Sequence, residues 1–357
     1  MSKVMIVAGG TGGHVFPGLA VAECLRSQGV DVVWVGTRSG LEARAVPTAG
    51  FAREWISIRG VRRRGVFAWL LLPMKLAVAI AQTLRIMWRH HPDVVLAMGG
   101  FVAGPGGLGA WLLRKPLLIH EQNAIPGFTN RWLALLADEV LCGFPGAFRN
   151  VPRAQHVGNP VRKDIATLPS TQGTRAQNGS LCLLVLGGTQ GAQVLNTVVP
   201  EALRAWKAGE DAEVWHQCGR NWLEPTRAAY ATISVPARVT AFIDDMATAY
   251  RWADLVICRA GAMTVAELCA AGRAAILVPY PHAVDGHQTA NAEFLAKREA
   301  AVLLPQEKFV ATRVRELIEG FSRHRELLAT IAFNARRCAM PDAAETISQL
   351  CLEAMHA

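Results

Sequence analysis

At 357 residues, the chain is longer than one hydrophobic core of ordinary size, and we expect two domains. Hydrophobic residues make up 51% of it, which is typical of a folded α/β enzyme and excludes a low-complexity protein. The net charge is +9, and all of the excess lies in residues 1–165, which carry 19 Lys and Arg against 9 Asp and Glu; the remaining residues carry 18 against 19. Nucleic acid, an anionic membrane surface or an anionic substrate would each explain this asymmetry.

Neither the cysteines nor the apolar segments indicate export or a membrane span. The eight cysteines are scattered without a Cys-x-x-Cys pair, a pattern that fits buried thiols in a reducing compartment. The apolar run before the first glycines is too short for a signal peptide. The most apolar stretch, residues 66–84, is interrupted by Pro73 and Lys75, so we expect no transmembrane helix.

Two glycine-rich turns of nearly the same sequence lie about half a chain apart. Residues 9–14 (GGTGGH) follow the apolar run 4–8, and residues 187–192 (GGTQGA) follow the apolar run 181–186. A strand that turns sharply into a helix favours glycine, and the helix start then presents free N–H groups to an anion. Neither turn matches the dinucleotide or P-loop motif. The turns therefore predict two anion-binding half-molecules that face one cleft, the alternative being tight strand-to-helix connections without a ligand.

Strand-like and helix-like segments alternate through both halves. We expect further strands at residues 32–36, 94–98, 117–120, 139–142, 214–217, 239–242, 255–258 and 276–279. This alternation predicts an α/β fold with two doubly wound, Rossmann-like parallel sheets. We expect the boundary near Asn159–Arg162, which gives domains of 1–161 and 162–340, with a loop at 168–180. A last helix, about 342–357, could fold back on the first domain.

A basic segment runs from Arg62–Arg64 into the helix that follows Pro73. On a helical wheel Lys75, Arg85 and Arg89 share one arc with Val78 and Ile86. Such a mixed face suits anionic lipid headgroups, the alternative being a core helix with a charged solvent edge. Nucleic acid is disfavoured because the segment lacks interleaved aromatic residues for base stacking.

Six further segments complete an ordered series of motifs. They are residues 98–107 (MGGFVAGPGG), 120–127 (HEQNAIPG), 157–162 (VGNPVR), 242–246 (FIDDM), 258–267 (CRAGAMTVAE) and 279–291, which begins PYP and ends HQTAN. From Gly9 to about Asn291 the series closely resembles the MurG family of peptidoglycan N-acetylglucosaminyltransferases. The resemblance implies a GT-B glycosyltransferase that binds UDP-GlcNAc mainly through residues 162–340. It places the acceptor, undecaprenyl-pyrophosphoryl-MurNAc-pentapeptide, on residues 1–161.

The resemblance also implies which residues bind the donor. Glu267 would accept hydrogen bonds from the ribose hydroxyls, and the first turn of the helix that begins after Gly261 would bind the diphosphate. Ile243, next to Phe242, would pack on the uracil ring. Gln288, helped by His287 and Asn291, would contact the sugar hydroxyls. The full implied set is Thr11, Gly12, Gly13, Asn123, Arg162, Thr189, Gln190, Ile243, Ala262, Met263, Thr264, Val265, Ala266, Glu267 and Gln288. We expect no metal and no cofactor, because the sequence has no Asp-x-Asp motif and the helix dipole can stabilise the leaving diphosphate.

His14 is the only titratable residue in the first glycine turn. It could accept the proton of the attacking 4-hydroxyl of the muramoyl sugar, or it could only position a substrate. Four positions depart from the family pattern, and none of them removes a group that the chemistry requires. They are Thr189, Ala260, Met263 and His287. The expected reaction is an inverting single displacement that converts lipid I into lipid II. Alternatives are a UDP-GlcNAc 2-epimerase, another glycolipid transferase, or a non-catalytic membrane scaffold.

The resemblance also implies where the protein acts. It predicts a peripheral protein on the cytoplasmic face of the bacterial inner membrane. Anionic inner-membrane lipid is the expected surface, with proteins of cell-wall synthesis and division as candidate partners.

Overall fold

The computed structural model describes residues 2–58, 72–169, 179–188, 190–204 and 212–356. The chain forms two units, residues 1–162 with 341–357 and residues 163–340. The division falls between Arg162 and Lys163, one residue after the expected boundary. Thr189 and Arg62–Arg64 lie outside the described residues, as does most of the expected loop at 168–180.

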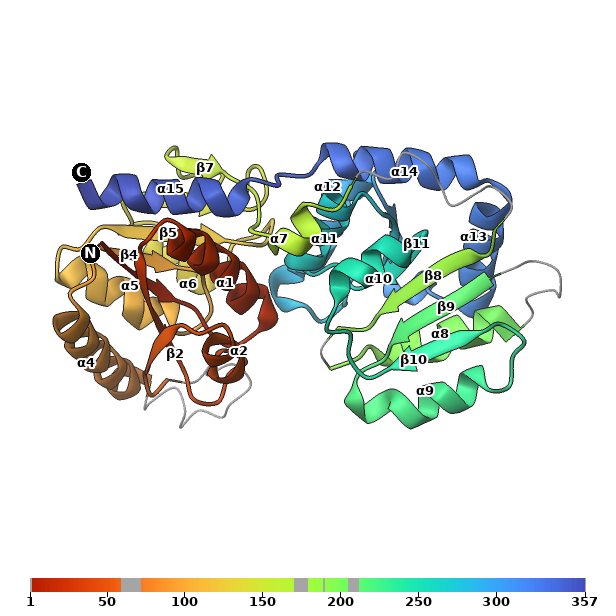
Figure 1. The fold of residues 1–357 in the computed structure, drawn as a ribbon, viewed down its shortest axis with the longest axis horizontal. Coiled ribbons are helices and arrows are strands. Elements are labelled where there is room, and N and C mark those ends of the chain that lie inside the picture. Colours follow the sequence, from red (N-terminus) through yellow and green to blue (C-terminus); the bar gives the residue numbers. More distant parts are fainter. Residues whose placement is uncertain (1, 59–71, 170–178, 189, 205–211, 357) are drawn as a thin grey trace. The chain divides into compact units, whose positions relative to one another are not determined.

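The first unit is a parallel sheet of seven strands in the order β3-β2-β1-β4-β5-β6-β7 (Figure 1). Its strands are β1 (Lys3–Val7), β2 (Asp31–Gly36), β3 (Ala52–Trp55), β4 (Val94–Ala97), β5 (Leu117–Glu121), β6 (Glu139–Cys142) and β7 (Ala154–His156). Its helices are α1 (Gly12–Ser27), α2 (Glu42–Thr48), α4 (Leu72–His90), α5 (Ala103–Leu112), α6 (Phe128–Leu133) and α15 (Ala343–His356).

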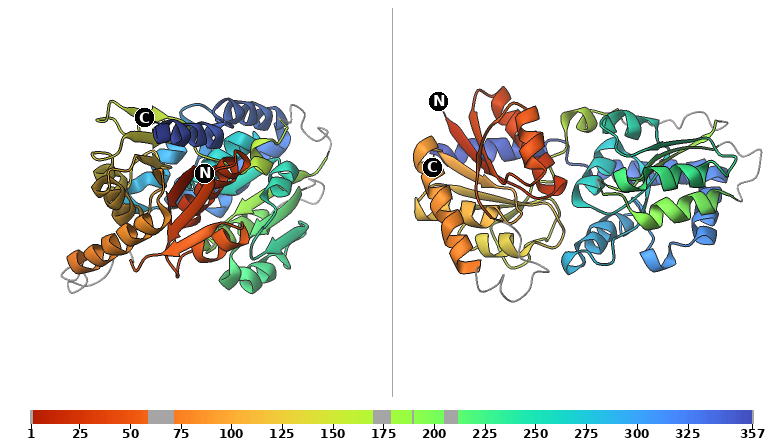
Figure 2. Two further views of the ribbon diagram at one scale, coloured as in Figure 1. Left: turned by 60° about the vertical axis from the view of Figure 1, so that its left-hand side comes forward. Right: turned by 90° about the horizontal axis from the view of Figure 1, so that it is seen from below.

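The C-terminal helix α15 belongs to the first unit. Ile347 and Cys351 are fully buried there and pack in one cluster with Val21 and Leu25 of α1. The Ser348 hydroxyl donates to the carbonyl of Val21 at 3.5 Å. The dark blue helix lies beside the red and orange elements in every view (Figure 2).

The second unit repeats this design with six parallel strands in the order β10-β9-β8-β11-β12-β13. Its strands are β8 (Leu181–Leu186), β9 (Ala212–Gln217), β10 (Ala237–Thr240), β11 (Leu255–Cys258), β12 (Ala274–Leu277) and β13 (Val302–Leu303). Its helices are α7 (Lys163–Ala166), α8 (Gln193–Arg204), α9 (Leu223–Tyr230), α10 (Met246–Trp252), α11 (Ala262–Ala271), α12 (His287–Ala296), α13 (Ala311–Arg323) and α14 (Arg325–Arg337). Short 3₁₀ turns lie at Arg220–Trp222, Val284–Gly286 and Gln306–Lys308.

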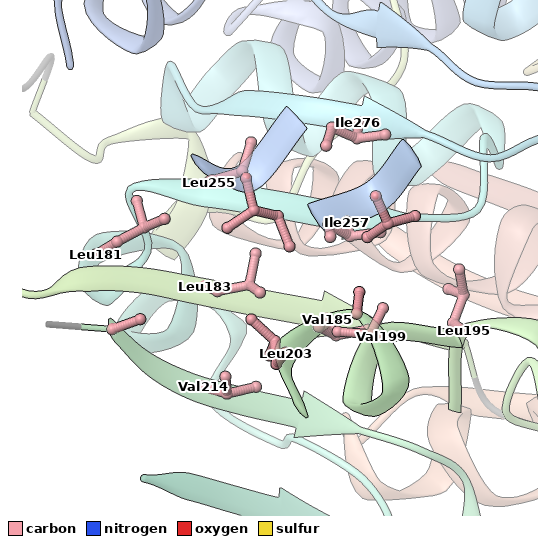
Figure 3. Packing of buried hydrophobic residues seen from close by; sticks show 14 of the residues in the cluster. Leu181, Leu183, Val185, Leu195, Val199, Leu203, Val214, Leu255, Ile257 and Ile276 are labelled. Carbon is pink, nitrogen blue, oxygen red and sulfur yellow. The ribbon is translucent and has the colours of Figure 1, made fainter. Parts of the chain in front are cut away.

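Branched aliphatic side chains fill the core of the second unit. Leu183 and Val185 of β8 and Ile257 of β11 pack with Leu195 and Val199 of α8 (Figure 3). Strands that are buried on both faces read as continuous apolar runs, which is why the sequence predicts them well. In each sheet the strand order reverses beside the first strand, between β1 and β4 and between β8 and β11, and open α/β sheets bind ligands outside the carboxyl ends of strands at such points.

Candidate functional site

Two glycine loops meet at the carboxyl ends of β1 and β4 in the first unit. Gly99 and Gly100 have φ angles of +96° and +78°, a conformation that favours glycine. A Cβ on Gly100 would lie 2.4 Å from the carbonyl oxygen of Gly9, so the loops can touch only because this side chain is absent. The contact fixes the turn that leads into α1, whose first residues are Gly12 and Gly13 and whose N-cap is the exposed Thr11.

His14 lies in the first turn of α1 and is half-buried. Its Nδ1 is 2.8 Å from Oε1 of Gln122 and 3.1 Å from the carbonyl oxygen of Met98. The ring also packs on Gly99, where a Cβ would lie 2.9 Å from Nδ1. The side chain is therefore held from one side, through Nδ1.

Gln122 connects His14 to a second histidine that the sequence did not single out. Nε2 of Gln122 is 3.0 Å from Nδ1 of His120, and Nε2 of His120 is 2.9 Å from the carbonyl oxygen of Gly158. Burial in the unit lowers the pKa of His120 to about 4, so its ring is neutral at physiological pH.

Two buried carboxylates organise the loops of the first unit, and sequence reasoning missed both. Glu121 accepts from the backbone and side-chain amide nitrogens of Asn123, each at 3.0 Å, and from the backbone N–H of Gly127 at 3.0 Å. Glu42 accepts from the backbone N–H of Gly10 at 3.0 Å and from the N–H and hydroxyl of Thr37 at 2.9 and 2.8 Å. An acidic residue within or just after a buried apolar strand is the signal that could have indicated Glu121.

The second glycine turn follows β8 in the second unit. The N–H of Gly188 donates to Oε1 of Gln217 at 3.1 Å, and Nε2 of Gln217 donates back to the carbonyl of Gly188 at 2.8 Å. Gly191 has a φ of +77°, and a Cβ there would lie 1.9 Å from the carbonyl oxygen of Cys218. Gln190 is exposed in this turn.

Helix α11 begins where the sequence predicts, with Gly261 as its N-cap. The N–H of Val265 donates to the carbonyl of Gly261 at 2.9 Å, so the N–H groups of the three preceding helical residues are the ones without an intrahelical acceptor. Those residues are Ala262, Met263 and Thr264. The side chain of Val265 is only 1% exposed, so neither it nor the backbone N–H is available to a ligand.

Glu267 lies on the same helix, in its second turn, and is half-buried beside Ala266. Its Oε2 accepts from the hydroxyl of the fully buried Tyr250 at 2.9 Å. A carboxylate has about four acceptor positions, so this bond orients Glu267 without using up its capacity to accept.

Among the other expected contacts, the strand end at Phe242 and Ile243 and the exposure of Asn291 differ from what the sequence suggested. Strand β10 ends at Thr240, so Phe242 and Ile243 lie in the following loop; Phe242 is 50% exposed and Ile243 only 5%. Gln288 lies with His287 in the first turn of α12. Its Oε1 accepts from the backbone N–H of Tyr280 at 2.9 Å. Asn291 is fully buried and donates to the carbonyl of Ala260, so it supports the loop instead of facing a sugar. Arg162 is half-buried at the end of the first unit.

The predicted face of α4 has the expected exposure at four of its five residues, and the prediction is wrong for Ile86. Lys75, Val78, Arg85 and Arg89 are exposed, but Ile86 is only 8% exposed. It lies at the edge of a stripe of Ala79, Thr83 and Met87 that faces the unit, a helical spacing that turns Ile86 inward. Met74 and Trp88, at 61% and 66% exposure, place large apolar side chains on the outer face beside Val78. Among the described helices, none has the length and apolar character to cross a bilayer.

Comparison with known proteins shows the family of the chain. Residues 4–142 match the glycosyltransferase family 28 N-terminal domain and residues 182–347 match the glycosyltransferase family 28 C-terminal domain. UDP-N-acetylglucosamine–N-acetylmuramyl-(pentapeptide) pyrophosphoryl-undecaprenol N-acetylglucosamine transferases from Nitrosococcus oceani and Methylococcus capsulatus are 52% and 50% identical over 352 and 355 residues, covering 98% of this chain and 98% of each relative.

Solved structures also show similarity over nearly the whole chain. The crystal structure of MurG from Acinetobacter baumannii is 40% identical, with a TM-score of 0.83 that covers 99% of this chain and 100% of that one. A UDP-GlcNAc 2-epimerase from Neisseria meningitidis shares only the fold, at 11% identity and a TM-score of 0.70, with 99% of this chain and 100% of that one covered. The fold is therefore GT-B, and the chain belongs to the MurG family of N-acetylglucosaminyltransferases within glycosyltransferase family 28.

Proposed function

We propose that the protein transfers GlcNAc from UDP-GlcNAc to the 4-hydroxyl of undecaprenyl-pyrophosphoryl-MurNAc-pentapeptide, converting lipid I into lipid II in peptidoglycan synthesis. The observation that carries the proposal is the start of α11, where three N–H groups without helical acceptors lie one turn before a half-buried carboxylate, Glu267. A nucleoside diphosphate offers the matching groups, an anion followed by two ribose hydroxyls. The identity of about 50% with curated transferases of this name supplies the sugar and the acceptor.

The donor would bind to the second unit. The N–H groups of Ala262, Met263 and Thr264 and the helix dipole would hold the diphosphate and stabilise the charge that develops on it as the glycosidic bond breaks. Glu267 would accept from the ribose hydroxyls and the backbone of Ile243 would pair with the uracil edge. Gln288, Gln190 and Thr189 would contact the sugar, with Ala266 beside the ribose and Arg162 near the diphosphate. Val265 would not contact the donor, because its side chain is buried in the unit and its N–H donates to the carbonyl of Gly261.

The acceptor would bind to the first unit, near Thr11, Gly12, Gly13 and Asn123. The 4-hydroxyl oxygen forms a bond to C1 of GlcNAc as the bond from C1 to the diphosphate oxygen breaks. His14 takes the hydroxyl proton on Nε2, and UDP leaves with the electron pair of the broken bond. A single displacement of this kind inverts the configuration at C1 and gives a β-1,4 linkage.

Labelled UDP-GlcNAc, supplied with and without lipid I, tests the reaction. We expect label in lipid only when lipid I is present. Sugar turnover that does not need lipid I would overturn the proposal in favour of an epimerase, and donor binding without any turnover would overturn it in favour of a scaffold.

Two substitutions test the residue roles. Glu267→Ala should weaken donor binding about 10-fold or more, since it removes a charge-assisted acceptor, whereas Glu224→Ala, an exposed glutamate of the same unit, should not. His14→Ala should lower kcat by about 10²–10⁴ with donor affinity retained, with the exposed His324→Ala as its control. Unchanged donor affinity in Glu267→Ala would refute the ribose assignment.

We further propose that the outer face of α4 holds the protein on the cytoplasmic surface of the inner membrane. The outer face of α4 spans about 100° around the helix axis and has Lys75 at its edge. Its residues are Met74, Val78, Arg85, Trp88 and Arg89. This face combines apolar groups that can enter the headgroup region with cations that attract anionic lipid. Helix α4 itself carries no acidic residue, and Arg89 forms an exposed ion pair with Glu54 of β3 at 3.5 Å, which a lipid headgroup would have to replace or join.

Co-sedimentation with vesicles tests the membrane face. The protein should bind vesicles rich in phosphatidylglycerol and bind phosphatidylcholine vesicles weakly. The double variant Arg85→Glu/Arg89→Glu should lose most of this binding, while Arg313→Glu, at an exposed arginine of the second unit, should keep it. Undiminished binding by the double variant would refute the assignment.

A further inference from the structure

An unbroken line of hydrogen bonds runs behind His14 through the first unit. It joins Nδ1 of His14 to Oε1 of Gln122 at 2.8 Å, then Nε2 of Gln122 to Nδ1 of His120 at 3.0 Å. It ends at the carbonyl oxygen of Gly158, 2.9 Å from Nε2 of His120. Gln122 and His120 are 1% and 0% exposed, so water does not compete for these groups.

The chemistry of the buried end decides where each hydrogen lies. A carbonyl oxygen only accepts, so Nε2 of His120 must carry a hydrogen toward Gly158. Since burial keeps His120 neutral, with a pKa of about 4, its Nδ1 has a lone pair and needs a donor. The amide nitrogen of Gln122 is that donor, and its second hydrogen goes to the carbonyl oxygen of Met98 at 2.9 Å.

This orientation of Gln122 leaves only one arrangement at His14. A flipped amide would direct its oxygen at two acceptors, Nδ1 of His120 and the carbonyl of Met98, so the flip is unfavourable. The oxygen of Gln122 therefore faces His14, and Nδ1 of His14 must donate to it. The same N–H also points to the Met98 carbonyl at 3.1 Å.

We propose that Gln122, backed by His120, is a positioning residue that fixes His14 as the Nδ1–H tautomer and leaves the Nε2 lone pair as the proton acceptor. This inference rests on the proposed role of His14 as the base. When Nε2 takes the proton of the acceptor hydroxyl, Nδ1–H continues to donate to the two oxygens of Gln122 and Met98, which stabilise the imidazolium that forms. Gly99 completes the arrangement, because any side chain there would push the ring off these oxygens.

Long-range ¹H–¹⁵N spectra of the full-length protein labelled with ¹⁵N-histidine test the inference directly. In the wild-type protein near pH 7.5 we expect His14 as the Nδ1–H form and His120 as the Nε2–H form, the signals being assigned from His14→Gln and His120→Gln. This measurement needs no variant of Gln122, so it decides the point even if such a variant folds poorly. A wild-type His14 that carries its hydrogen on Nε2 would overturn the inference.

Gln122→Met and Gln122→Glu separate orientation from mere packing. Methionine fills a similar volume without a strong acceptor, so His14 should become a mixture of tautomers and kcat should fall about 10- to 100-fold, with KM for the donor unchanged. Glutamate still accepts from Nδ1–H, so it should keep the His14 tautomer. Its second oxygen would face Nδ1 of His120 and the Met98 carbonyl without a hydrogen to donate, so it should recover only part of the lost kcat. The exposed Gln155→Met serves as the matched control and should behave as wild type.

The two levels of the proposal fail in different ways. Full activity of His14→Ala would refute the base itself. A large loss in His14→Ala together with an unchanged tautomer and kcat in Gln122→Met would leave the base standing and overturn the role of Gln122.

Discussion

The buried carboxylate of Glu42 stabilises the first glycine turn, and we expect Glu42→Gln to destabilise the first unit by about 1–3 kcal/mol. Glu42 is fully buried, and its two oxygens receive the N–H of Gly10 and both donors of Thr37. Glutamine has the same shape but only one oxygen. If that oxygen keeps Thr37, the new amide nitrogen faces the N–H of Gly10, so one bond to a charged acceptor is lost and two buried donors oppose each other.

Urea unfolding followed by tryptophan fluorescence measures this cost, since the fully buried Trp34, bonded to the carbonyl of Ala8, reports on the same region. Glu23→Gln, on the exposed side of α1, is the matched control and should change the free energy of unfolding by less than about 0.5 kcal/mol. Because the turn leads directly to His14, kcat of Glu42→Gln should fall as well. A Glu42→Gln protein as stable as the control would refute the assignment of the carboxylate as the anchor of the turn.

Further predictions concern the buried histidines and the second glycine turn. Burial lowers the pKa of His120 to about 4 and that of His216 to about 3, below the value near 6.5 of the unfolded chain, so unfolding takes up protons below pH 6.5. The free energy of unfolding should therefore reach its maximal value above pH 6.5 and fall by about 2 kcal/mol per histidine by pH 5. A free energy of unfolding that stays constant over that pH range would contradict this. Gly191→Ala should lower thermal stability strongly, since its Cβ would overlap the carbonyl of Cys218, while Gly188→Ala, with open space and the same positive φ, should cost only about 1–2 kcal/mol. Equal melting temperatures for the two alanine variants would show that the close approach at Gly191 is not rigid.

The sequence predicts strands well where they are buried on both faces, whereas it shifts the edge strand β10 by two residues and misses the edge strands β3, β7 and β13. The apolar runs at Leu181–Leu186 and Leu255–Cys258 have the same bounds in the structure. Strand β3, at Ala52–Trp55, has no fully buried residue, and β7 and β13 have only three and two residues, so no apolar run marks them. An edge strand gains its order from a neighbouring strand that a local pattern cannot represent.

The same limit applies to the candidate site. The glycine turns, His14 and Glu267 are local motifs and stand out in the sequence. Gln122 bonds a residue 108 positions away and Glu42 one 32 positions away, and such partners become visible only when the sheet brings the strand ends together. The Ile86 error has a similar origin, since a helical wheel gives the angle of a side chain but not the direction of the core.

The two glycine turns differ in what lies beneath them, and this difference favours their assignment to different substrates. In the first turn the N–H of Gly10 is bonded to a carboxylate of Glu42, whereas in the second turn the equivalent N–H of Gly188 is bonded to the neutral amide of Gln217. A buried negative charge directly behind a glycine turn opposes the binding of a second anion there, because the low dielectric of the interior does little to screen it. A neutral amide orients its turn without that penalty. The first turn is thus better suited to support His14 beside an uncharged sugar hydroxyl than to hold a phosphate, while the second remains compatible with the donor.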